Sequence, residues 1–464
     1  MAEVAQQVIK MIRKESDSAA HQHLRAAPGN HPDRKDRHVT GIDHPSSTGV
    51  IYVMNRARRH GWTYGDPTWA NFGQGAPEVG PIPEGAERPT TFTFPIESYE
   101  YAGTAGTTKL RQAVASMYND IHRQGKTSQY TYENVCIVPG GRAGLTRVAA
   151  VVGDVNVGYF LPEYTAYEQM LSVFKKFVPI PTPLDEDKSY GFDSDLLDSE
   201  IRARGLGVVM VSNPHNPTGQ LVQGEGLNKC VKVARKRKCT LVLDEFYSCY
   251  VYDQDEEEDG RMVSAAEYIE DVNNDPVIIV DGLTKNHRLP GWRVCWLVGP
   301  KDVVSSMQAA GSFLDGGANH PLQEAALPML DPKHYRSEAR ALQRHFRAKR
   351  NYVLARLAQM GFTIHHPPHS TFYIWLDLCS LPEPLDNGLH FFEECLKEKV
   401  VLVPGIFFDI NPSQRRELFD SPCHHFVRLS FGPSMDVLER GLDGIERVMA
   451  KCGTSRTSTS FPQN

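Results

Sequence analysis

Short apolar runs that alternate with amphipathic stretches are the feature of this chain that most constrains its fold. Strands are predicted for six of these runs: Val135–Val138, Val155–Phe160, Val208–Val211, Thr240–Leu243, Val277–Val280 and Val294–Val298. Helices are predicted for four other segments: Lys109–Ile121, Ala143–Val152, Tyr164–Phe174 and Gly224–Ala234. Continuously apolar strands are typical of a sheet covered on both faces, and helical crossovers join parallel strands. The pattern therefore predicts an α/β domain around a mostly parallel sheet.

A different pattern begins after Leu330, where the alternation of strands and helices stops. We expect a smaller α+β domain from a long helix, two strands and a last helix: Tyr335–Met360, Thr371–Leu376, Val400–Val403 and Met435–Ala450. The N-terminal segment is expected to join this domain, so that both chain ends build it. The expected divisions are a flexible lead-in (1–48), a segment joining the small domain and the pocket (49–95), the large domain (96–330), the small domain (331–452) and a disordered tail (453–464).

Charge and cysteine content argue against several classes of protein. A formal net charge of −6 and the lack of a basic stripe argue against a nucleic-acid binder. No apolar run reaches the ~18 residues of a membrane span, so no membrane association is predicted. The nine cysteines are scattered without a CxxC pair, as in proteins of a reducing compartment, and no metal-ligand spacing appears. We therefore expect a cytoplasmic protein without a metal site.

Polar side chains follow three of the predicted strands, where the ligands of such sheets bind. One strand runs into a rigid turn with two Asn-Pro pairs, which can orient the amide of Asn216. The next ends at Asp244, a carboxylate that is costly to bury unless it meets a cation, and Tyr247 follows it. The third leads to Lys285, whose amine becomes a nucleophile toward an aldehyde if it is desolvated near other cations. Arg293, eight residues later, suits a phosphate.

Together the three strand ends resemble the class I and II aminotransferases, which are fold-type I enzymes that use pyridoxal 5′-phosphate. The resemblance extends from about Gly49 to Ala450 and implies a seven-stranded sheet in the large domain. It implies that Lys285 holds the cofactor as a Schiff base and that Asp244 pairs with the pyridine nitrogen. Tyr247, the third residue expected to be catalytic, would reach the ring hydroxyl oxygen together with the amide of Asn216.

The resemblance also implies the rest of the cofactor site. The run Gly140–Ala143 resembles the family's phosphate cup, in which backbone N–H groups at a helix N-terminus point at the phosphate. Tyr164 would stack on the pyridine ring, and Tyr101 would reach the phosphate of a neighbouring subunit, which implies a homodimer with shared active sites. The residues expected to bind the cofactor are Tyr101, Gly141, Arg142, Ala143, Tyr164, Asn216, Asp244, Tyr247, Thr284, Lys285 and Arg293.

Three residues are expected to bind the substrate. Arg428 lies in a run that resembles the family motif whose arginine holds the α-carboxylate of the amino acid, a group that a guanidinium grips with two parallel hydrogen bonds. Gly75 lies in a run that resembles the N-terminal loop lining the substrate pocket, and Asn216 faces the same space. No second arginine motif for a distal carboxylate is evident. Aromatic residues in the segments expected to close the pocket indicate an apolar or large substrate side chain; they are Tyr52, Trp62, Tyr64, Trp69, Phe372 and Tyr373.

Gly282 and Arg142 are two of the positions that depart from the family pattern. Gly282 stands where the family often has serine, so one hydroxyl contact to the phosphate is missing. Arg142 stands in the cup where small or hydroxyl residues are common, and it either adds charge to the phosphate site or extends toward the substrate. The cofactor prediction does not depend on either position.

The function predicted from these residues is transamination between an L-amino acid and a 2-oxo acid. The same residues also serve a lyase, cyclase or oxidase that acts on an amino acid, as in carbon–sulfur lyases or aminocyclopropanecarboxylate synthase. A remote alternative is a non-catalytic sensor like the aminotransferase-like half of some transcription regulators. The identity of the amino acid and the pathway stay open.

Overall fold

The computed structural model describes residues 49–88, 90–252, 259–416, 418 and 420–455. The predicted lead-in at 1–48 and residues 456–464 of the predicted tail lie outside this range. The last helix, α14 (Met435–Ser455), continues through residues 453–455, which were expected to belong to the tail.

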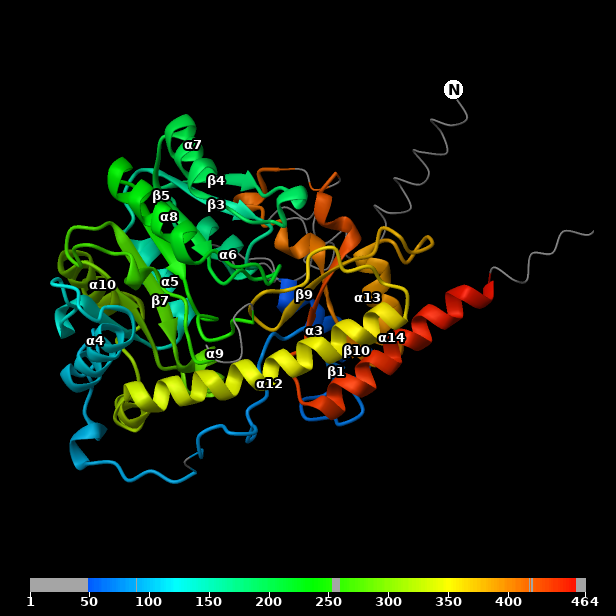
Figure 1. Ribbon diagram of the computed structural model, residues 1–464, viewed down its shortest axis with the longest axis horizontal. Helices are drawn as coiled ribbons and strands as arrows, with labels where there is room; N and C mark the ends of the chain where they lie inside the picture. Colours follow the sequence, from blue (N-terminus) through cyan, green and yellow to red (C-terminus); the bar gives the residue numbers. More distant parts are fainter. Residues whose placement is uncertain (1–48, 89, 253–258, 417, 419, 456–464) are drawn as a thin grey trace, which may run out of the picture.

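A seven-stranded sheet forms the centre of the larger part of the molecule (Figure 1). Its order is β2 (Val135–Val138), β8 (Cys295–Val298), β7 (Val277–Gly282), β6 (Thr240–Asp244), β5 (Leu206–Ser212), β3 (Asn156–Leu161) and β4 (Val178–Pro183). Strand β8 runs antiparallel to β2 and β7, and the other neighbours are parallel. The mostly parallel, seven-stranded fold class is confirmed.

Helices pack against this sheet as the alternating pattern predicts. Those of the larger part are α4 (Thr108–His122), α5 (Gly141–Val151), α6 (Ala166–Val173), α7 (Ser194–Arg204), α8 (Gly224–Arg237), α9 (Leu283–Asn286), α10 (Lys301–Leu314) and α11 (His320–Ala326). Helices α5 and α10 pack against each other, and α7 and α8 form a second pair. The four predicted helices agree with α4, α5, α6 and α8 to within a few residues at each end.

Strand β4 is the one strand of the large sheet that the sequence pattern missed. Its sequence, Val-Pro-Ile-Pro-Thr-Pro, carries proline at every second position, and proline cannot donate to a sheet ladder. Because β4 is an edge strand that pairs only with β3, the prolines replace residues whose N–H groups point away from the sheet. The same prolines that argue against a central strand are therefore compatible with this edge.

The second part of the molecule contains a three-stranded antiparallel sheet of β11 (Val403–Pro404), β12 (Phe426–Ser430) and β9 (Tyr373–Asp377). Helix α13 (Gly388–Lys397) packs beside it, and α14 packs against α13 and α12. The long helix α12 (Pro332–Gln359) extends along both parts (Figure 1). Its start is fixed by Asp331, whose carboxylate accepts hydrogen bonds from the backbone of Lys333 and His334, both at 3.0 Å.

The N-terminal segment belongs to this second part. Helix α3 (Gly49–Arg59) contacts it, and β1 (Ala70–Asn71) pairs in parallel with β10 (Val400–Val401). The single strand predicted at Val400–Val403 is wrong, because Val400–Val401 pairs with the N-terminal segment while β11 pairs with β12. Both chain ends thus build the smaller α+β part, as predicted.

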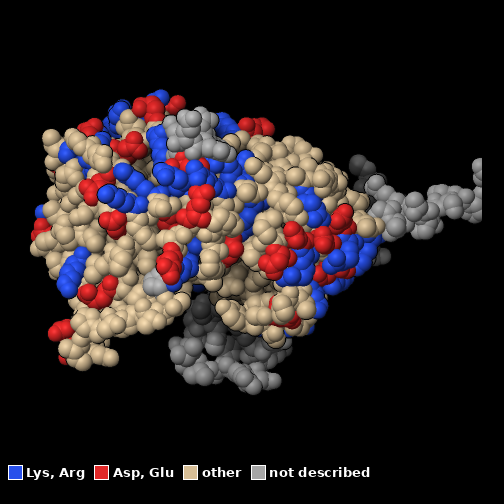
Figure 2. Space-filling view, turned by 60° about the horizontal axis from the view of Figure 1, so that its bottom comes forward, with Lys and Arg blue, Asp and Glu red and all other residues tan. Residues whose placement is uncertain are grey.

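Charged side chains of both signs are interspersed over the face shown in Figure 2. No helix among the described residues is long and apolar enough to cross a membrane. Within the same described ranges, no group of three His, Cys, Asp or Glu residues is arranged to hold a metal ion.

Substitution of Gly282 by alanine should destabilise the protein. Gly282 lies opposite Cys295 in the β7–β8 ladder, and a Cβ atom at this position would lie 2.6 Å from the Cys295 Cα atom. Because that atom belongs to the backbone, relief requires the strands to separate, at a cost of about 1–3 kcal/mol. Denaturant unfolding should show a lower midpoint for Gly282→Ala. Gly226→Ala is the control, because the nearest atom to its Cβ would be 3.6 Å away, and a lowered midpoint there would contradict the steric account.

Candidate functional site

One cavity lies at the carboxyl ends of the parallel strands, where β5, β6 and β7 deliver Asn216, Asp244 and Lys285. Its volume is about 550 Å³. The predicted site residues that line it are Gly75, Gly141, Arg142, Tyr164, Asn216, Asp244, Tyr247, Thr284, Lys285, Arg293 and Arg428. Strands β5, β6 and β7 are parallel neighbours, so their carboxyl ends lie at the same edge of the sheet. Residues far apart in the chain therefore meet here.

The Asp244 carboxylate is buried beside this cavity with few partners. It accepts a 3.3 Å hydrogen bond from the Tyr167 hydroxyl and a 3.4 Å bond from the Phe246 backbone. Desolvation raises the pKa of Asp244 to about 6, although those hydrogen bonds and the nearby Lys285 amine lower it. A buried carboxylate with such weak partners favours a cation on its cavity side.

The amine of Lys285 lies in the wall of the same cavity. Burial lowers its pKa to about 7, and the positive charges of Arg428, Arg142 and Arg293 act in the same direction. The nearby Asp244 carboxylate opposes the change. Near neutral pH a large fraction of this amine is therefore unprotonated and nucleophilic.

Gly75 contacts Lys285 through its main-chain oxygen, which accepts a 2.5 Å hydrogen bond from the Lys285 Nζ atom. The residue has a φ of +64°, and an added Cβ would lie 2.5 Å from the Tyr373 hydroxyl oxygen. Only glycine fits both the backbone conformation and the space. The sequence prediction placed Gly75 in the pocket wall, but its contact with the lysine amine was not foreseen.

Tyr373 is a member of the site to which the sequence assigned no specific role. Its hydroxyl lies 2.6 Å from the Tyr247 hydroxyl and 3.3 Å from the Gly75 oxygen. The Arg428 guanidinium lies 4.1 Å from the centre of its ring. Tyr373 was recognised only as one of several aromatic residues expected near the pocket, because its role depends on the register of β9 against β12.

Arg428 is buried and oriented by fixed acceptors. Its Nη1 atom donates to the Asn216 side-chain oxygen at 2.8 Å, and its Nη2 atom donates to the Gly73 oxygen at 2.9 Å. Among the described residues, none accepts a hydrogen bond from the Arg428 Nε atom, which is buried. A buried donor without a partner is costly, so the arrangement suits an anionic ligand that completes it.

A tight cradle lies at the start of α5. Gly140 has a φ of +102°, and a Cβ there would lie 1.8 Å from the Arg293 Nη2 atom. The first-turn N–H groups of α5, from Gly141, Arg142 and Ala143, have no acceptor within the helix. Free N–H groups beside a guanidinium form a binding site for a phosphate group. Ala143 follows the two lining residues in this turn and does not itself line the cavity.

Thr284 and Tyr101, two other residues predicted to bind the cofactor, lie outside the cradle. The Thr284 hydroxyl lies 3.2 Å from the Cys295 sulfur while the residue lines the cavity. Tyr101 is 97% exposed and lines a separate surface hollow. Within a single chain it does not reach the cavity, so its predicted role in a neighbouring subunit's site stays a prediction.

Helix α3 contributes residues to the cavity that the sequence prediction missed. Val50, Met54 and Arg58 line it at a spacing of four residues, which places them on one face of a helix. Trp62 and Tyr64, two of the aromatic residues expected to close the pocket, follow the helix and also line the cavity. The four-residue spacing was present in the sequence, but no helix was predicted at 49–59.

The chain is similar to known aminotransferases in sequence and in fold. The family model described as aminotransferase class I and II matches residues 67–445. The probable aspartate/prephenate aminotransferase of Aquifex aeolicus is 24% identical over 353 residues, which cover 75% of this chain and 83% of that protein. The LL-diaminopimelate aminotransferase of Natranaerobius thermophilus is 26% identical over 344 residues, which cover 73% of this chain and 83% of that protein.

Solved structures show the same fold. A crystal structure of an aminotransferase from Mycobacterium tuberculosis superposes with a TM-score of 0.71 at 22% identity, covering 90% of this chain and 100% of that one. The aspartate aminotransferase of Thermus thermophilus with maleate superposes with a TM-score of 0.69 at 21% identity, covering 87% and 97%. The resemblance stated from the sequence is confirmed.

The Lys285 amine of the cofactor-free protein should titrate near pH 7, as its lowered pKa of about 7 requires. Its acetylation rate should rise about tenfold per pH unit below that value, where the amine is protonated, and level off above it. Mass spectrometry of the Lys285 peptide after short pulses of acetic anhydride measures this rate. The exposed Lys176 in the same digest reports the reactivity of an amine in water. A Lys285 rate that still rises steeply at pH 9 would contradict the assignment.

Proposed function

This chain belongs to the class I and II aminotransferase family, and from that premise we propose which of its residues carry the reaction. The family uses pyridoxal 5′-phosphate, so the protein is a pyridoxal-phosphate-dependent aminotransferase that moves an amino group between an L-amino acid and a 2-oxo acid. The observation that carries the residue assignment is that Lys285 and Asp244 line one cavity at adjacent strand ends.

The residues around the cavity fit the cofactor. The cradle of Gly140, Gly141 and Arg293, which a single Cβ atom would fill, suits its phosphate. The buried Asp244 carboxylate suits its protonated pyridine nitrogen, because that cation offsets the desolvation that raises the Asp244 pKa. The Lys285 amine, with its lowered pKa, suits its aldehyde.

When bound, pyridoxal 5′-phosphate supplies an aldehyde that takes up the substrate amine and a ring that accepts electrons from the α-carbon. The Asp244 carboxylate would hold a proton on the ring nitrogen, and the positive charge kept there would make the ring a better acceptor of the negative charge that develops during the reaction. The Lys285 Nζ atom would take the α-proton of the substrate as general base and then release it as general acid. Tyr247 and Asn216 would donate hydrogen bonds to the ring hydroxyl oxygen.

Arg428 binds the α-carboxylate of the amino acid in this proposal. Support comes from its burial, the unpartnered Nε donor and the two fixed acceptors, Asn216 and Gly73, that hold the guanidinium plane. The hydrogen bond between Arg428 and Asn216 couples the residue proposed to bind the carboxylate to a residue proposed to bind the ring. A substrate that draws Arg428 toward its carboxylate therefore also frees the Asn216 oxygen.

We propose that the substrate carries a second anionic group, in place of the apolar side chain that the aromatic residues indicated from the sequence. Four arginines line the cavity, and Asp244 is the one carboxylate among its described lining residues. Arg293 and Arg428 are assigned to the phosphate and the α-carboxylate, which leaves Arg58 and Arg142 without an anion. The Arg142 guanidinium has long hydrogen bonds of 3.3 and 3.4 Å to the Tyr164 hydroxyl. The relatives named for aspartate, prephenate and diaminopimelate support a substrate with a distal carboxylate.

We propose further that the protein is a homodimer with shared sites. Large apolar side chains gather near Tyr101: Tyr99 is 81% exposed, Ile96 73% and Phe313 73%. Tyr99 and Tyr101 line the same hollow as residues 315–321, which follow Phe313 in the chain. Exposed apolar groups concentrated in one region are typical of a protein interface.

The expected divisions at residues 95 and 330 and the cytoplasmic location also stay proposals. The pairing of β1 with β10 supports the assignment of the N-terminal segment to the small domain. Seven of the eight described cysteines are buried and all eight are free, which is compatible with a reducing compartment.

Loss of the Asp244 carboxylate should remove most of the activity. The Asp244→Ala variant, saturated with cofactor, should lose about 10²–10³-fold in kcat, as enzymes do when a well-placed electrostatic group is removed. Turnover is followed as oxo-acid-dependent formation of the new amino acid. Asp198→Asn, which changes a surface carboxylate paired with Arg237, is the control. Ammonia release without an added oxo acid would instead support a lyase or oxidase.

The Arg142→Met variant tests the second anionic group. Its kcat/KM should fall by about 10–100-fold for dicarboxylic amino acids, the cost of a lost charged hydrogen bond, while neutral amino acids change little. Steady-state kinetics with aspartate, 2-aminoadipate, leucine and phenylalanine provide the comparison. An equal loss for all four, together with weaker cofactor binding, would assign Arg142 to the phosphate instead.

A further inference from the structure

Residues 73–88, which we call the N-terminal strap, contact the two most important cations of the site through main-chain oxygens. The Gly75 oxygen accepts a 2.5 Å hydrogen bond from Lys285, and the Gly73 oxygen accepts a 2.9 Å bond from Arg428. The positions of the Lys285 and Arg428 side chains therefore depend on the position of the strap. The strap itself is held by a polar network outside the cavity.

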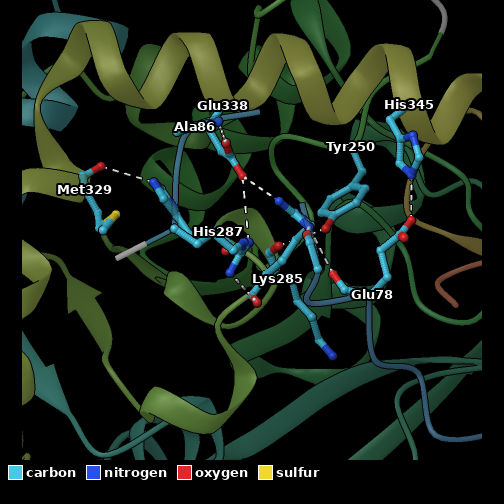
Figure 3. A network of polar contacts seen from close by, with 11 residues as sticks. Glu78, Ala86, Tyr250, Lys285, His287, Met329, Glu338 and His345 are labelled. Atoms are coloured by element: carbon cyan, nitrogen blue, oxygen red, sulfur yellow. Dashed lines mark hydrogen bonds and ion pairs between the residues drawn. The ribbon is translucent and has the colours of Figure 1, made fainter. Parts of the chain in front are cut away.

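Glu78 anchors the strap to helix α12. Its Oε1 atom accepts hydrogen bonds from His345 at 2.6 Å and from Lys349 at 2.7 Å. Figure 3 shows the Glu78 carboxylate and the His345 ring directed toward each other from the strap and the helix. Lys349 is buried and also donates a 3.0 Å bond to the Gly432 oxygen, which accepts a further bond from the Glu78 backbone at 2.9 Å. Glu78 is not among the residues that line the cavity.

The charges of this anchor depend on each other. Burial alone would raise the pKa of Glu78, but the hydrogen bond from His345 and the charge of Lys349 lower it to about 2. Burial lowers the pKa of Lys349 to about 8, although Glu78 counteracts this. Removing one member of a buried ion pair leaves the other charge without compensation, so such a change is strongly destabilising.

A second anchor connects the strap to the turn that carries Lys285. Arg288 donates a 2.5 Å hydrogen bond to the Gly80 oxygen, and its backbone N–H donates to the Lys285 oxygen at 2.9 Å. Glu338 of α12 accepts from the Ala86 backbone at 2.9 Å and from Arg288 at 3.4 Å (Figure 3). The strap is thus held between α12 on one side and the Lys285 turn on the other.

The chain between Glu78 and Gly75 is stiff. Pro77 has a fixed φ, and it restricts the backbone of Ala76 before it. A Cβ on Gly432 would lie 2.5 Å from the Ala76 oxygen, so this stretch also packs closely against the end of β12. A displacement of Glu78 is therefore transmitted to the Gly75 oxygen instead of being absorbed by the two intervening residues.

We propose that Glu78 is a positioning residue for amino transfer: held by Lys349 and His345, it places the Gly75 oxygen against the Lys285 amine and the Gly73 oxygen against Arg428. This inference rests on the proposed roles of Lys285 and Arg428. Glu78 acts through the strap and touches neither the substrate nor the cofactor.

The experiment compares Glu78→Gln with Glu84→Gln by hydrogen exchange of the full chain, with and without pyridoxal 5′-phosphate. The matched control, Glu84, also lies in the strap and pairs with Arg344 of the same helix, but that pair is exposed. Amides of residues 73–80 should exchange about tenfold faster or more in Glu78→Gln, as expected when a buried pair loses its charge. Glu84→Gln should exchange like the unchanged protein.

Kinetics provide the second measurement. In Glu78→Gln the KM for the amino acid should rise by about tenfold while kcat falls less, because Arg428 loses a fixed acceptor before the chemical step. Lys349→Met should reproduce both effects, and the double variant Glu78→Gln/Lys349→Met should show less than the sum of the two single effects, because both changes remove the Glu78–Lys349 pair. Glu78→Asp, which keeps the charge, should recover part of the loss.

Unchanged exchange at residues 73–80 in Glu78→Gln would overturn the proposal, as would equal effects of Glu84→Gln. Additive effects of the Glu78 and Lys349 changes would also overturn it. Hydrogen exchange does not depend on turnover. If the unchanged enzyme failed to transaminate, the proposed function would fail while the exchange results still decided whether Glu78 holds the strap.

Discussion

The cost of keeping the Asp244 carboxylate away from water organises this site. Strand β6 ends at Asp244 inside the molecule. Within the described chain, the only hydrogen bonds to the Asp244 carboxylate are long ones from Tyr167 and Phe246. A carboxylate in that position either takes up a proton or meets a cation. Burial raises the pKa of this carboxyl to about 6 despite those hydrogen bonds, so the described residues compensate its charge only in part and the site favours a further cation.

The residues that line the cavity carry an excess of positive charge, and that excess has two consequences. It attracts anions, for which Arg293 and Arg428 supply hydrogen-bond donors in fixed positions. It also adds to burial, the larger cause, in lowering the pKa of Lys285, so that the amine is available as nucleophile and base near neutral pH. Binding and reactivity therefore arise from one distribution of charge, and a substrate with two anionic groups would match it better than a neutral one.

Three layers of contacts hold this distribution in place. Asp244 and Lys285 lie at the ends of the parallel strands, and Arg428 and Tyr373 lie on the small sheet. The strap contacts Lys285 and Arg428 through its backbone oxygens. Helix α12 joins the layers, because Glu338, His345 and Lys349 bind the strap from one helix. A helix that spans both parts of the molecule can in this way affect a cavity that it does not line.

The sequence by itself determined the features that depend on local order along the chain. Apolar runs predicted all the strands of the large sheet except β4, and the residues after them predicted Asn216, Asp244 and Lys285, because the carboxyl ends of parallel strands meet at one edge. Tertiary structure alone decided the rest. The edge position of β4 made its prolines acceptable, and the β9–β12 register placed Tyr373 beside Tyr247. The contact of Glu78 with Lys349 joins residues 271 positions apart, and no local pattern encodes it because its energy comes from burial of two charges together.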